Sequence, residues 1–124
     1  SIEKIIAMKP DIYIMTGSKR ANQNVLPFGY NVSKDEVTPI FNKLLSRPTF
    51  GTIEPIKEGK VFGVYHHFYN HPYNIIGMEV LAKDLYPQAL PKLNPEADYH
   101  HIIKNFTQIP DSPVTLSYSL QDGK

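Results

Sequence analysis

The period of hydrophobic positions changes several times along the chain, and these changes predict alternating helices and strands. Residues 1–8 carry Ile at helical spacing and stop at Lys9-Pro10, which predicts the end of a helix. Residues 11–15 are apolar, with β-branched and aromatic side chains, as in a strand covered on both faces of a parallel sheet. The polar stretch 16–24 predicts a loop at the carboxyl end of that strand.

A second helix-and-strand unit follows. Thr38-Pro39 fits a cap followed by proline at the first helical position, while Ser33 and Glu36 fit a capping box further upstream. Because a capping box would place proline inside the helix, the pattern predicts two short helical pieces. Residues 60–65 predict a second strand. The apolar stripe of the helical region is Ile40, Phe41, Leu44 and Leu45.

Two further helices and an ambiguous tail complete the pattern. Asn74 caps a helix over 75–86, and Asn94-Pro95 opens another. Residues 110–124 alternate weakly, so they form either an edge strand or a loose tail. Two clear strands are few for a sheet covered on both faces, which means that the tail and a loop add strands or that the chain is a piece of a larger lobe. The stripes predicted to be buried are Ile75, Met78, Leu81, Ala82 and Leu85, then Tyr99, Ile102, Ile103 and Phe106.

Composition narrows the functional classes. At 124 residues the chain has the length of one domain, and 41% hydrophobic and 20% charged residues suit a packed core. Thirteen Lys and Arg against twelve Asp and Glu give a net charge of +1, with no basic stripe for nucleic acid. The absence of cysteine excludes disulfides, thiolate nucleophiles and cysteine-ligated metals. No run approaches the ~18 apolar residues of a membrane span, and a targeting peptide is expected outside this sequence.

The densest polar cluster follows the second predicted strand. Between His66 and Tyr73 the chain carries three histidines and two tyrosines, side chains that can ligate iron, nickel or haem iron. His67 and His71 are four residues apart, but Pro72 argues against one shared helix face, so the identity of any metal stays unknown. The alternative is a set of rings that packs a strand-to-helix loop. If the extended backbone continued past the strand, residues 66–69 would alternate between its two sides.

Lys19 and Arg20 lie in the first loop, at the same predicted sheet edge as the histidine cluster. A guanidinium there suits a carboxylate, a catecholate or a haem propionate, and the alternative is an exposed basic loop. Glu79 and Asp84 are expected on a solvated helix face. No nucleophile elbow, phosphate-binding loop or zinc-protease motif is present, so no catalytic residue is assigned and the chain is not expected to be an enzyme.

Several stretches in order resemble one family. Residues 1–14 look like the "helix, Lys/Asn-Pro-Asp, strand" signature of periplasmic substrate-binding proteins that serve iron-siderophore, haem and cobalamin ABC importers. Residues 45–62 are similar to that family's segment from an Arg-Pro turn into a Lys-x-Gly-Arg-Val-Tyr strand. Residues 73–87 resemble its closing helix with a Leu-Tyr-Pro motif, and residues 93–96 the Asp-x-Asp-Pro that follows. The resemblance spans roughly residues 1 to 107.

The resemblance implies a two-lobed protein that holds its ligand between the lobes. This chain would be a single domain over residues 1–124, the later part of the C-terminal lobe, with the N-terminal lobe outside it. The implied fold is a partial three-layer, Rossmann-like α/β lobe with helices flanking a small, mostly parallel sheet. The family also places a carboxylate on each lobe to engage the ABC permease, and Glu36 is the candidate here. The residues expected to bind ligand are Lys19, Arg20, His66, His67, Tyr69, His71 and Tyr73.

The function implied by the resemblance is binding of a ferric siderophore-type chelate in the periplasm or at the cell surface, for delivery to an ABC importer. A lipid anchor on the full-length protein is left open. The iron complex would be cargo, and no resident cofactor is expected. Haem, cobalamin or another metal chelate are alternatives within the same class. Two alternatives belong to other functional classes. One is a metal-dependent hydrolase that uses the His66–His71 cluster, and the other is an interaction domain whose aromatic loop binds a partner protein.

Overall fold

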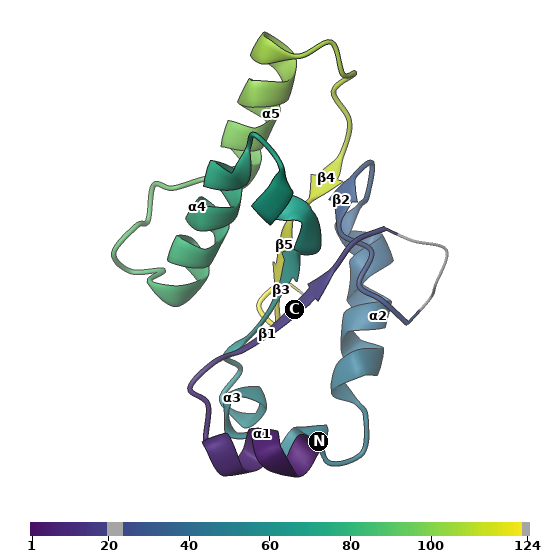
Figure 1. Ribbon diagram of the computed structural model, residues 1–124, viewed down its shortest axis with the longest axis vertical. Coiled ribbons are helices and arrows are strands. Elements are labelled where there is room, and N and C mark those ends of the chain that lie inside the picture. Colours follow the sequence, from purple (N-terminus) through teal and green to yellow (C-terminus); the bar gives the residue numbers. More distant parts are fainter. Residues whose placement is uncertain (20–23, 123–124) are drawn as a thin grey trace.

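A small central sheet lies between two layers of helices in the computed structural model, which describes residues 1–19 and 24–122 (Figure 1). Its middle strand, β3, pairs in parallel with β1 and antiparallel with β5. A separate two-residue ladder joins β2 to β4. The strands are β1 (Tyr13–Gly17), β2 (Gly29–Tyr30), β3 (Val61–Tyr65), β4 (Val114–Thr115) and β5 (Ser117–Ser119). The tail therefore contributes an edge strand, β5, to this sheet. Of the two alternatives predicted for residues 110–124, the edge strand is confirmed.

The helices mostly begin where the sequence predicts. Asn94 caps α5 by accepting a hydrogen bond from the backbone N–H of Ala97 at 3.1 Å. The first predicted strand was placed two residues too early, because β1 runs on into the expected loop. No helix within the described part of the chain is long and apolar enough to cross a membrane. The helices are α1 (Ile2–Met8), α2 (Lys34–Leu45), α3 (Glu54–Lys57), α4 (Asn74–Leu85) and α5 (Pro95–Phe106), with 3-10 turns at Phe50–Thr52 and His66–Asn70.

Helix α2 is continuous, so the prediction of two short pieces was wrong. Its capping box is formed, with the Ser33 backbone N–H donating to Glu36 Oε1 at 3.1 Å. Pro39 lies inside the helix and lacks the N–H that would bind the carbonyl of Asp35, which belongs to an exposed residue. One turn earlier, the Thr38 hydroxyl donates to the Lys34 carbonyl at 3.0 Å. The proline is tolerated because Asp35 lies on the exposed side of the helix, where water can bind its carbonyl.

Each face of the sheet has its own core. On one face, α2 packs over alternate residues of the strands, including Val61 of β3 and Tyr118 of β5. On the other face, α4 and α5 pack over Val64 and Leu116. Figure 1 shows α2 and α4 on opposite sides of the strands. The α2 core consists of Leu26, Phe28, Val32, Val37, Phe41, Leu44, Val61 and Tyr118, and the α4/α5 core of Val64, Phe68, Ile76, Val80, Tyr99, Ile103, Val114 and Leu116.

The buried stripe of α4 differs from the predicted one. The helix buries Ile76, Gly77 and Val80, whereas Met78 is 65% exposed. In α5, Tyr99 and Ile103 are buried as predicted, but Phe106 is 75% exposed. The predicted residues do share one face of α4, but that face points away from this sheet, so the prediction that they are buried was wrong. The members of the predicted α4 stripe that are exposed are Ile75, Met78, Leu81 and Leu85.

The segment after β3 does not stay extended. Residues 66–70 form a 3-10 turn, so the expected alternation of their side chains is wrong. Phe68 of this turn is buried and lies directly against α4. A Cβ atom at Gly77 would be 2.6 Å from the Phe68 ring, which means that only glycine lets the helix approach this closely. The contact fixes the turn that carries the histidine cluster.

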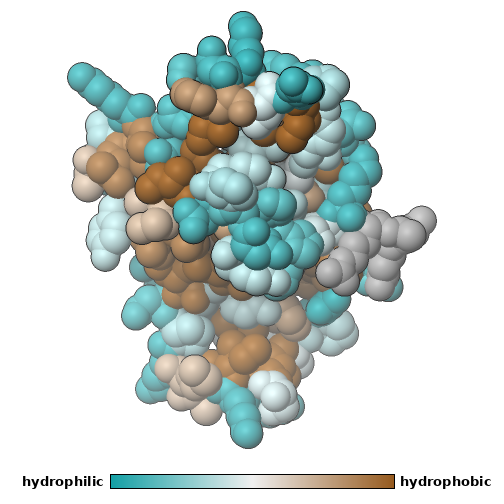
Figure 2. Space-filling model, turned by 45° about the horizontal axis from the view of Figure 1, so that its top comes forward, coloured by the Kyte–Doolittle hydropathy of each residue, from teal (hydrophilic) through white to brown (hydrophobic). Residues whose placement is uncertain are grey.

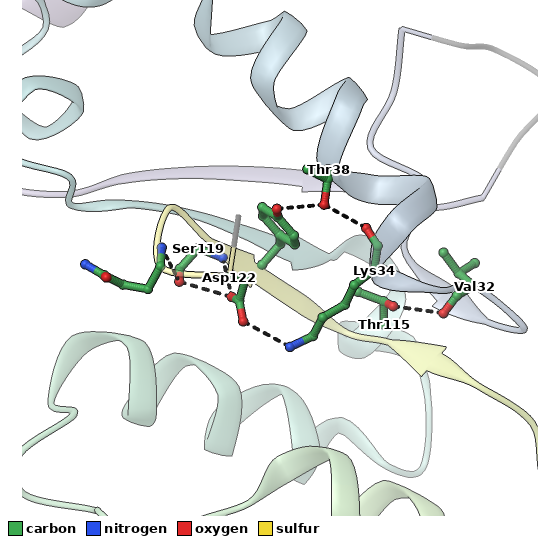
Figure 3. Close-up of polar contacts among 8 residues, drawn as sticks. Val32, Lys34, Thr38, Thr115, Ser119 and Asp122 are labelled. Carbon is green, nitrogen blue, oxygen red and sulfur yellow. Dashed lines mark hydrogen bonds and ion pairs between the residues drawn. The ribbon is translucent and has the colours of Figure 1, made fainter. Parts of the chain in front are cut away.

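The C-terminal strand is tied to α2 by polar side chains (Figure 3). The Thr38 and Tyr118 hydroxyls are 2.7 Å apart, and the Thr115 hydroxyl donates to the Val32 carbonyl at 2.8 Å. Beyond the strand, Lys34 Nζ donates to Asp122 Oδ1 at 3.0 Å. The tail therefore closes the α2 layer instead of lying loose.

We expect Asp122→Asn to weaken the fold near neutral pH by about 1 kcal/mol, since a half-exposed ion pair is screened by water. Burial alone would raise the pKa of Asp122, but hydrogen bonds from Lys34 and Ser119 outweigh burial and hold that pKa below its usual value. The stabilisation is thus present above the unfolded pKa and is lost as the pH falls through the lower folded pKa. Urea unfolding at about pH 7 and pH 2 checks this, and an equal loss at both would contradict it.

Candidate ligand-binding site

The two predicted polar loops leave the sheet at the same edge. Strands β1 and β3 run parallel with Gly17 opposite Tyr65, so the residues that follow each strand start side by side. Lys19 comes two residues after the end of β1, and His66 comes directly after β3. The predicted placement of the two loops at one sheet edge is confirmed.

Contacts between the loops pass through the β2 segment. The Lys19 backbone N–H donates to the Phe28 carbonyl at 2.8 Å. The next residue, Gly29, has a φ of 126° and lies under the Tyr65 ring, where a Cβ would be 3.1 Å from a ring carbon. A side chain at this position would be strained and would displace the ring. Gly29 therefore lets the first loop pack against the aromatic cluster.

Tyr65 lies at the centre of a group of rings. Its ring centroid is 5.7 Å from that of His67 and 5.3 Å from that of Phe68, both edge to face, and it stacks on His71 at 6.5 Å. His71 and Tyr73 are stacked with centroids 4.8 Å apart and planes 7° apart. Such contacts fix ring orientation and add about 0.5–1.5 kcal/mol each beyond the burial of area.

Two of the predicted residues lie further out. Tyr69 is 71% exposed, and its ring meets His66 edge to face at 5.6 Å. His66 and His67 also meet edge to face, at 5.2 Å. The rings around Tyr65 thus pack against one another, whereas His66 and Tyr69 are exposed to solvent.

The Lys19 side chain is engaged by neighbouring groups of the protein. Lys19 Nζ donates to the Asn31 carbonyl at 3.0 Å and forms an ion pair with Glu36 at 3.5 Å, so its charge is directed toward the start of α2. Arg20 lies outside the described residues. The other oxygen of Glu36 accepts the capping hydrogen bond, and that bond lowers the pKa of Glu36. Glu36 thus holds the helix cap, and its role at a permease stays a prediction.

The hydroxyls of Tyr65, Tyr73 and Tyr99 keep their protons at neutral pH. Burial raises the pKa of Tyr65 and Tyr73 above the usual value, and burial raises the pKa of Tyr99, which packs edge to face on Tyr73, to about 12. In this state the phenols can donate hydrogen bonds and stack, whereas a tyrosinate ligand would have to lose a proton first.

The described histidines do not form a metal centre. Across residues 1–19 and 24–122, no group of three His, Asp or Glu side chains is placed to hold a metal ion. A catalytic metal needs about three protein ligands and an open position, so this arrangement gives no support to the hydrolase alternative. Stacking rings and neutral phenols instead suit a ligand that brings its own chelating groups.

Tyr65 was not among the residues expected to bind ligand, although its ring lies at the centre of the candidate site. The side chain is half-buried and joins both cores as well as the ring cluster. Its position as the last residue of a strand, just before the candidate loop, is the signal that could have found it.

Comparison with known proteins identifies the fold. No protein-family model matches the sequence, and no curated protein matches it. Among solved structures, the chain is similar to the TroA-like periplasmic binding protein FepB from Veillonella parvula, with a TM-score of 0.85 over 94% of this chain and 18% identical residues. These residues have the fold of part of a TroA-like periplasmic binding protein. The prediction of a partial three-layer α/β lobe is confirmed.

The chain spans only 34% of the length of the FepB chain, so the similarity covers about a third of that protein. In open α/β sheets, ligands bind beyond the carboxyl ends of the strands. The two candidate loops lie at that edge of the TroA-like sheet.

Proposed function

We propose that this chain is the later part of the C-terminal lobe of a periplasmic or otherwise extracytoplasmic substrate-binding protein, which binds a ferric siderophore-type chelate and delivers it to an ABC importer. The observation that carries the proposal is the ring cluster around Tyr65, which lies beside the first loop at the ligand-binding edge of the sheet. The TroA-like fold supports the class, because a periplasmic binding protein carries a small molecule to a membrane permease.

The chemistry of the rings favours a preformed complex over a bare ion. A chelate already satisfies its metal, so the protein needs only to stack on its flat groups and to donate hydrogen bonds to its oxygens. His67 would offer a ring face, while His71 and Tyr73, which stack on each other, would offer ring edges with N–H or O–H donors. His66 and Tyr69 would contact the outer part of the ligand, and Lys19 and Arg20 would offset negative charge.

The mechanism would be closure of two lobes around the chelate. Ligand that binds the closed state more tightly shifts the equilibrium toward closure, and the closed protein then docks on the permease. Glu36 is the docking carboxylate that we propose for this lobe. The N-terminal lobe would supply the other half of the site.

We expect the double variant His67→Ala/His71→Ala, made in the complete gene product, to bind a ferric chelate at least tenfold more weakly. Loss of two ring contacts removes about 2 kcal/mol, and 1.4 kcal/mol corresponds to a factor of ten. Quenching of tyrosine fluorescence during titration with a ferric catecholate, a ferric hydroxamate, haemin or cobalamin measures the affinity and ranks these ligands.

The matched control is His100→Ala/His101→Ala, which removes two histidines from α5 outside the ring cluster around Tyr65. It should bind within about twofold of the parent protein. Equal affinity of the parent and the His67→Ala/His71→Ala variant for every one of these ligands would contradict the proposed site.

A further inference from the structure

A cavity of about 660 Å³ lies at the end of the sheet opposite the ring cluster around Tyr65. Ile12 directly precedes β1 and Lys60 directly precedes β3, and both line the cavity, which therefore lies at the amino ends of the two parallel strands. The ring cluster follows their carboxyl ends, and five residues of strand span about 16 Å. Small-molecule pockets usually measure about 300–1,000 Å³. The cavity is thus large enough for a ligand and separate from the candidate site.

The wall of the cavity combines apolar side chains with a few polar ones. Ile12 and Phe62 come from the sheet side, and Leu85 comes from the last turn of α4. Ser117 of β5 and Gln121 of the tail add a hydroxyl and an amide group. Such a wall suits a ligand with an apolar body and one polar end, because apolar contacts supply affinity and the polar groups fix orientation.

Asp84, in the last turn of α4, supplies a carboxyl group to this cavity. Its Oδ2 atom is buried and has no hydrogen-bond partner among residues 1–19 and 24–122. Asp84 was expected on a solvated helix face, and the structure corrects this prediction. Mainly through burial, the pKa of Asp84 is raised to about 7, so the group is mostly ionised at pH 8. A partly buried carboxylate without a partner is costly, and it also meets the negative end of the helix dipole.

The basic side chains in the wall are already engaged by other groups. Lys34 Nζ donates to Asp122 Oδ1 at 3.0 Å (Figure 3), and Lys60 Nζ forms an ion pair with Glu58 at 3.0 Å. Lys83 Nζ donates to a backbone carbonyl oxygen at 2.8 Å. The carboxylate on α4 therefore needs a cation that a ligand would bring.

An organic cation fits this cavity better than a metal ion or an anion. Within the described part of the chain, no three His, Asp or Glu side chains are placed to hold a metal ion. The start of α5 also lines the cavity, but its first turn already carries Glu96 and Asp98, and the Asn94 side chain caps it. An ammonium group has three N–H donors, which suit the Asp84 carboxylate and the Ser117 hydroxyl.

We propose that this cavity is a second ligand site, which binds a small organic ammonium ion with an apolar body. The ammonium group donates to Asp84, and the apolar body lies against Phe62 and Leu85. A charge-assisted hydrogen bond in a partly dry cavity makes the site selective for the cation over a neutral molecule of the same shape. The inference goes beyond the proposed function, since it uses no residue of the ring cluster and needs no metal chelate.

Titration calorimetry of the complete gene product at pH 8 with 2-phenylethylamine and 2-phenylethanol tests the site. The probes share the same apolar body, and only the amine is charged at this pH. We expect the amine to bind at least tenfold more tightly than the alcohol, and Asp84→Asn to weaken binding of the amine at least tenfold. Absence of amine binding, equal affinities for the two probes, or an Asp84→Asn variant within twofold of the parent protein would overturn the inference.

Glu79→Gln is the matched control for the charge. Glu79 lies on the same helix, and its Oε2 atom is also buried without a hydrogen-bond partner among the described residues, but Glu79 does not line the cavity. This variant should bind the amine within about twofold of the parent protein. A loss as large as that of Asp84→Asn would show that the cavity is not the site.

A second control addresses adsorption of the probe on exposed apolar side chains. Figure 2 shows hydrophobic residues on the side of the molecule where α4 lies in Figure 1, and Met78 of α4 is 65% exposed. Met78→Gln makes this surface more polar and leaves the cavity intact, so it should not change the affinity for 2-phenylethylamine. A tenfold loss would place the amine on the surface of α4 and overturn the inference.

Competition separates this site from the proposed function. Saturating 2-phenylethylamine should leave the affinity for a ferric catecholate within about twofold, because the cavity and the ring cluster lie at opposite ends of the sheet. Mutual displacement would overturn a separate site. A gene product that binds the amine but no chelate would refute the proposed function and keep the second site.

Discussion

Gly77→Val is expected to destabilise the protein by about 3 kcal/mol. A Cβ atom at this position would be 2.6 Å from Cγ and 2.7 Å from Cβ of Phe68, and Phe68 is buried in the α4/α5 core. Neither the helix nor the ring can yield without disturbing the turn that carries the histidines, so the added carbons overpack the core. Chemical denaturation followed by circular dichroism measures the loss.

Gly51→Val is the matched control, because a Cβ at Gly51 meets nothing within 4 Å. It should change stability by no more than about 0.5 kcal/mol. The cost of Gly77→Val should also shrink in a Phe68→Ala background, since alanine lacks the ring and its Cγ, the atom 2.6 Å from the added Cβ. Additive losses in the double variant would show that the ring contact is not the cause.

Asp84→Asn is expected to stabilise the isolated chain by about 2 kcal/mol at pH 8 and to have almost no effect at about pH 4. Burial and, to a smaller extent, the neighbouring charge of Asp122 raise the pKa of Asp84 to about 7, although the charge of Lys83 opposes this shift. Between about pH 4 and 7 the folded chain holds a proton that the unfolded chain has released, so stability falls as the pH rises through this window. Because asparagine cannot ionise, the Asp84→Asn variant does not lose this stability as the pH rises.

The full shift of the Asp84 pKa would correspond to about 4 kcal/mol, and partial access of water to the carboxyl halves the expected effect. Thermal unfolding at several pH values checks the sign and the window. Asp11→Asn is the control, since Asp11 is an exposed carboxylate on the rim of the same cavity. A constant difference between Asp84→Asn and the parent at all pH values would contradict the assigned titration.

Local signals predicted most helix starts because the responsible interactions span three or four residues. Asn94 and Ala97, or Ser33 and Glu36, meet within a single turn, so their side chains fix the cap whatever the rest of the chain does. The β2–β4 ladder has two residues in each strand, too few for any periodicity, and it was not predicted. It forms because the tail returns to a segment more than eighty residues earlier.

The phase of α4 could not be read from its own residues. The helix carries apolar side chains on two sides, and which side meets the sheet is decided by Gly77, whose missing side chain admits the Phe68 ring. The spacing of the apolar residues favours burial of the larger stripe, which contains Met78. The structure buries the smaller stripe instead. A pattern reflects every partner of a helix, including any that these residues do not contain.

The candidate site was predictable at the level of loops but not of side chains. Parallel strands bring their carboxyl ends together, so the loops after β1 and β3 had to be neighbours once both strands were recognised. The engagement of Lys19 by Glu36 depends on how α2 packs, which no local pattern encodes. The functional roles of the ring residues remain predictions for the binding experiments.

The long sequence separation between β3 and β5 bears on how the protein is made. Tyr118 fills the α2 core and Ser117–Ser119 completes the sheet beside β3, which was synthesised more than fifty residues before. A growing polypeptide on the ribosome therefore cannot finish this core until residues 117–119 emerge from the exit tunnel. Pairings of such long sequence separation form slowly, and until then α2 and β3 expose the surface that β5 will cover.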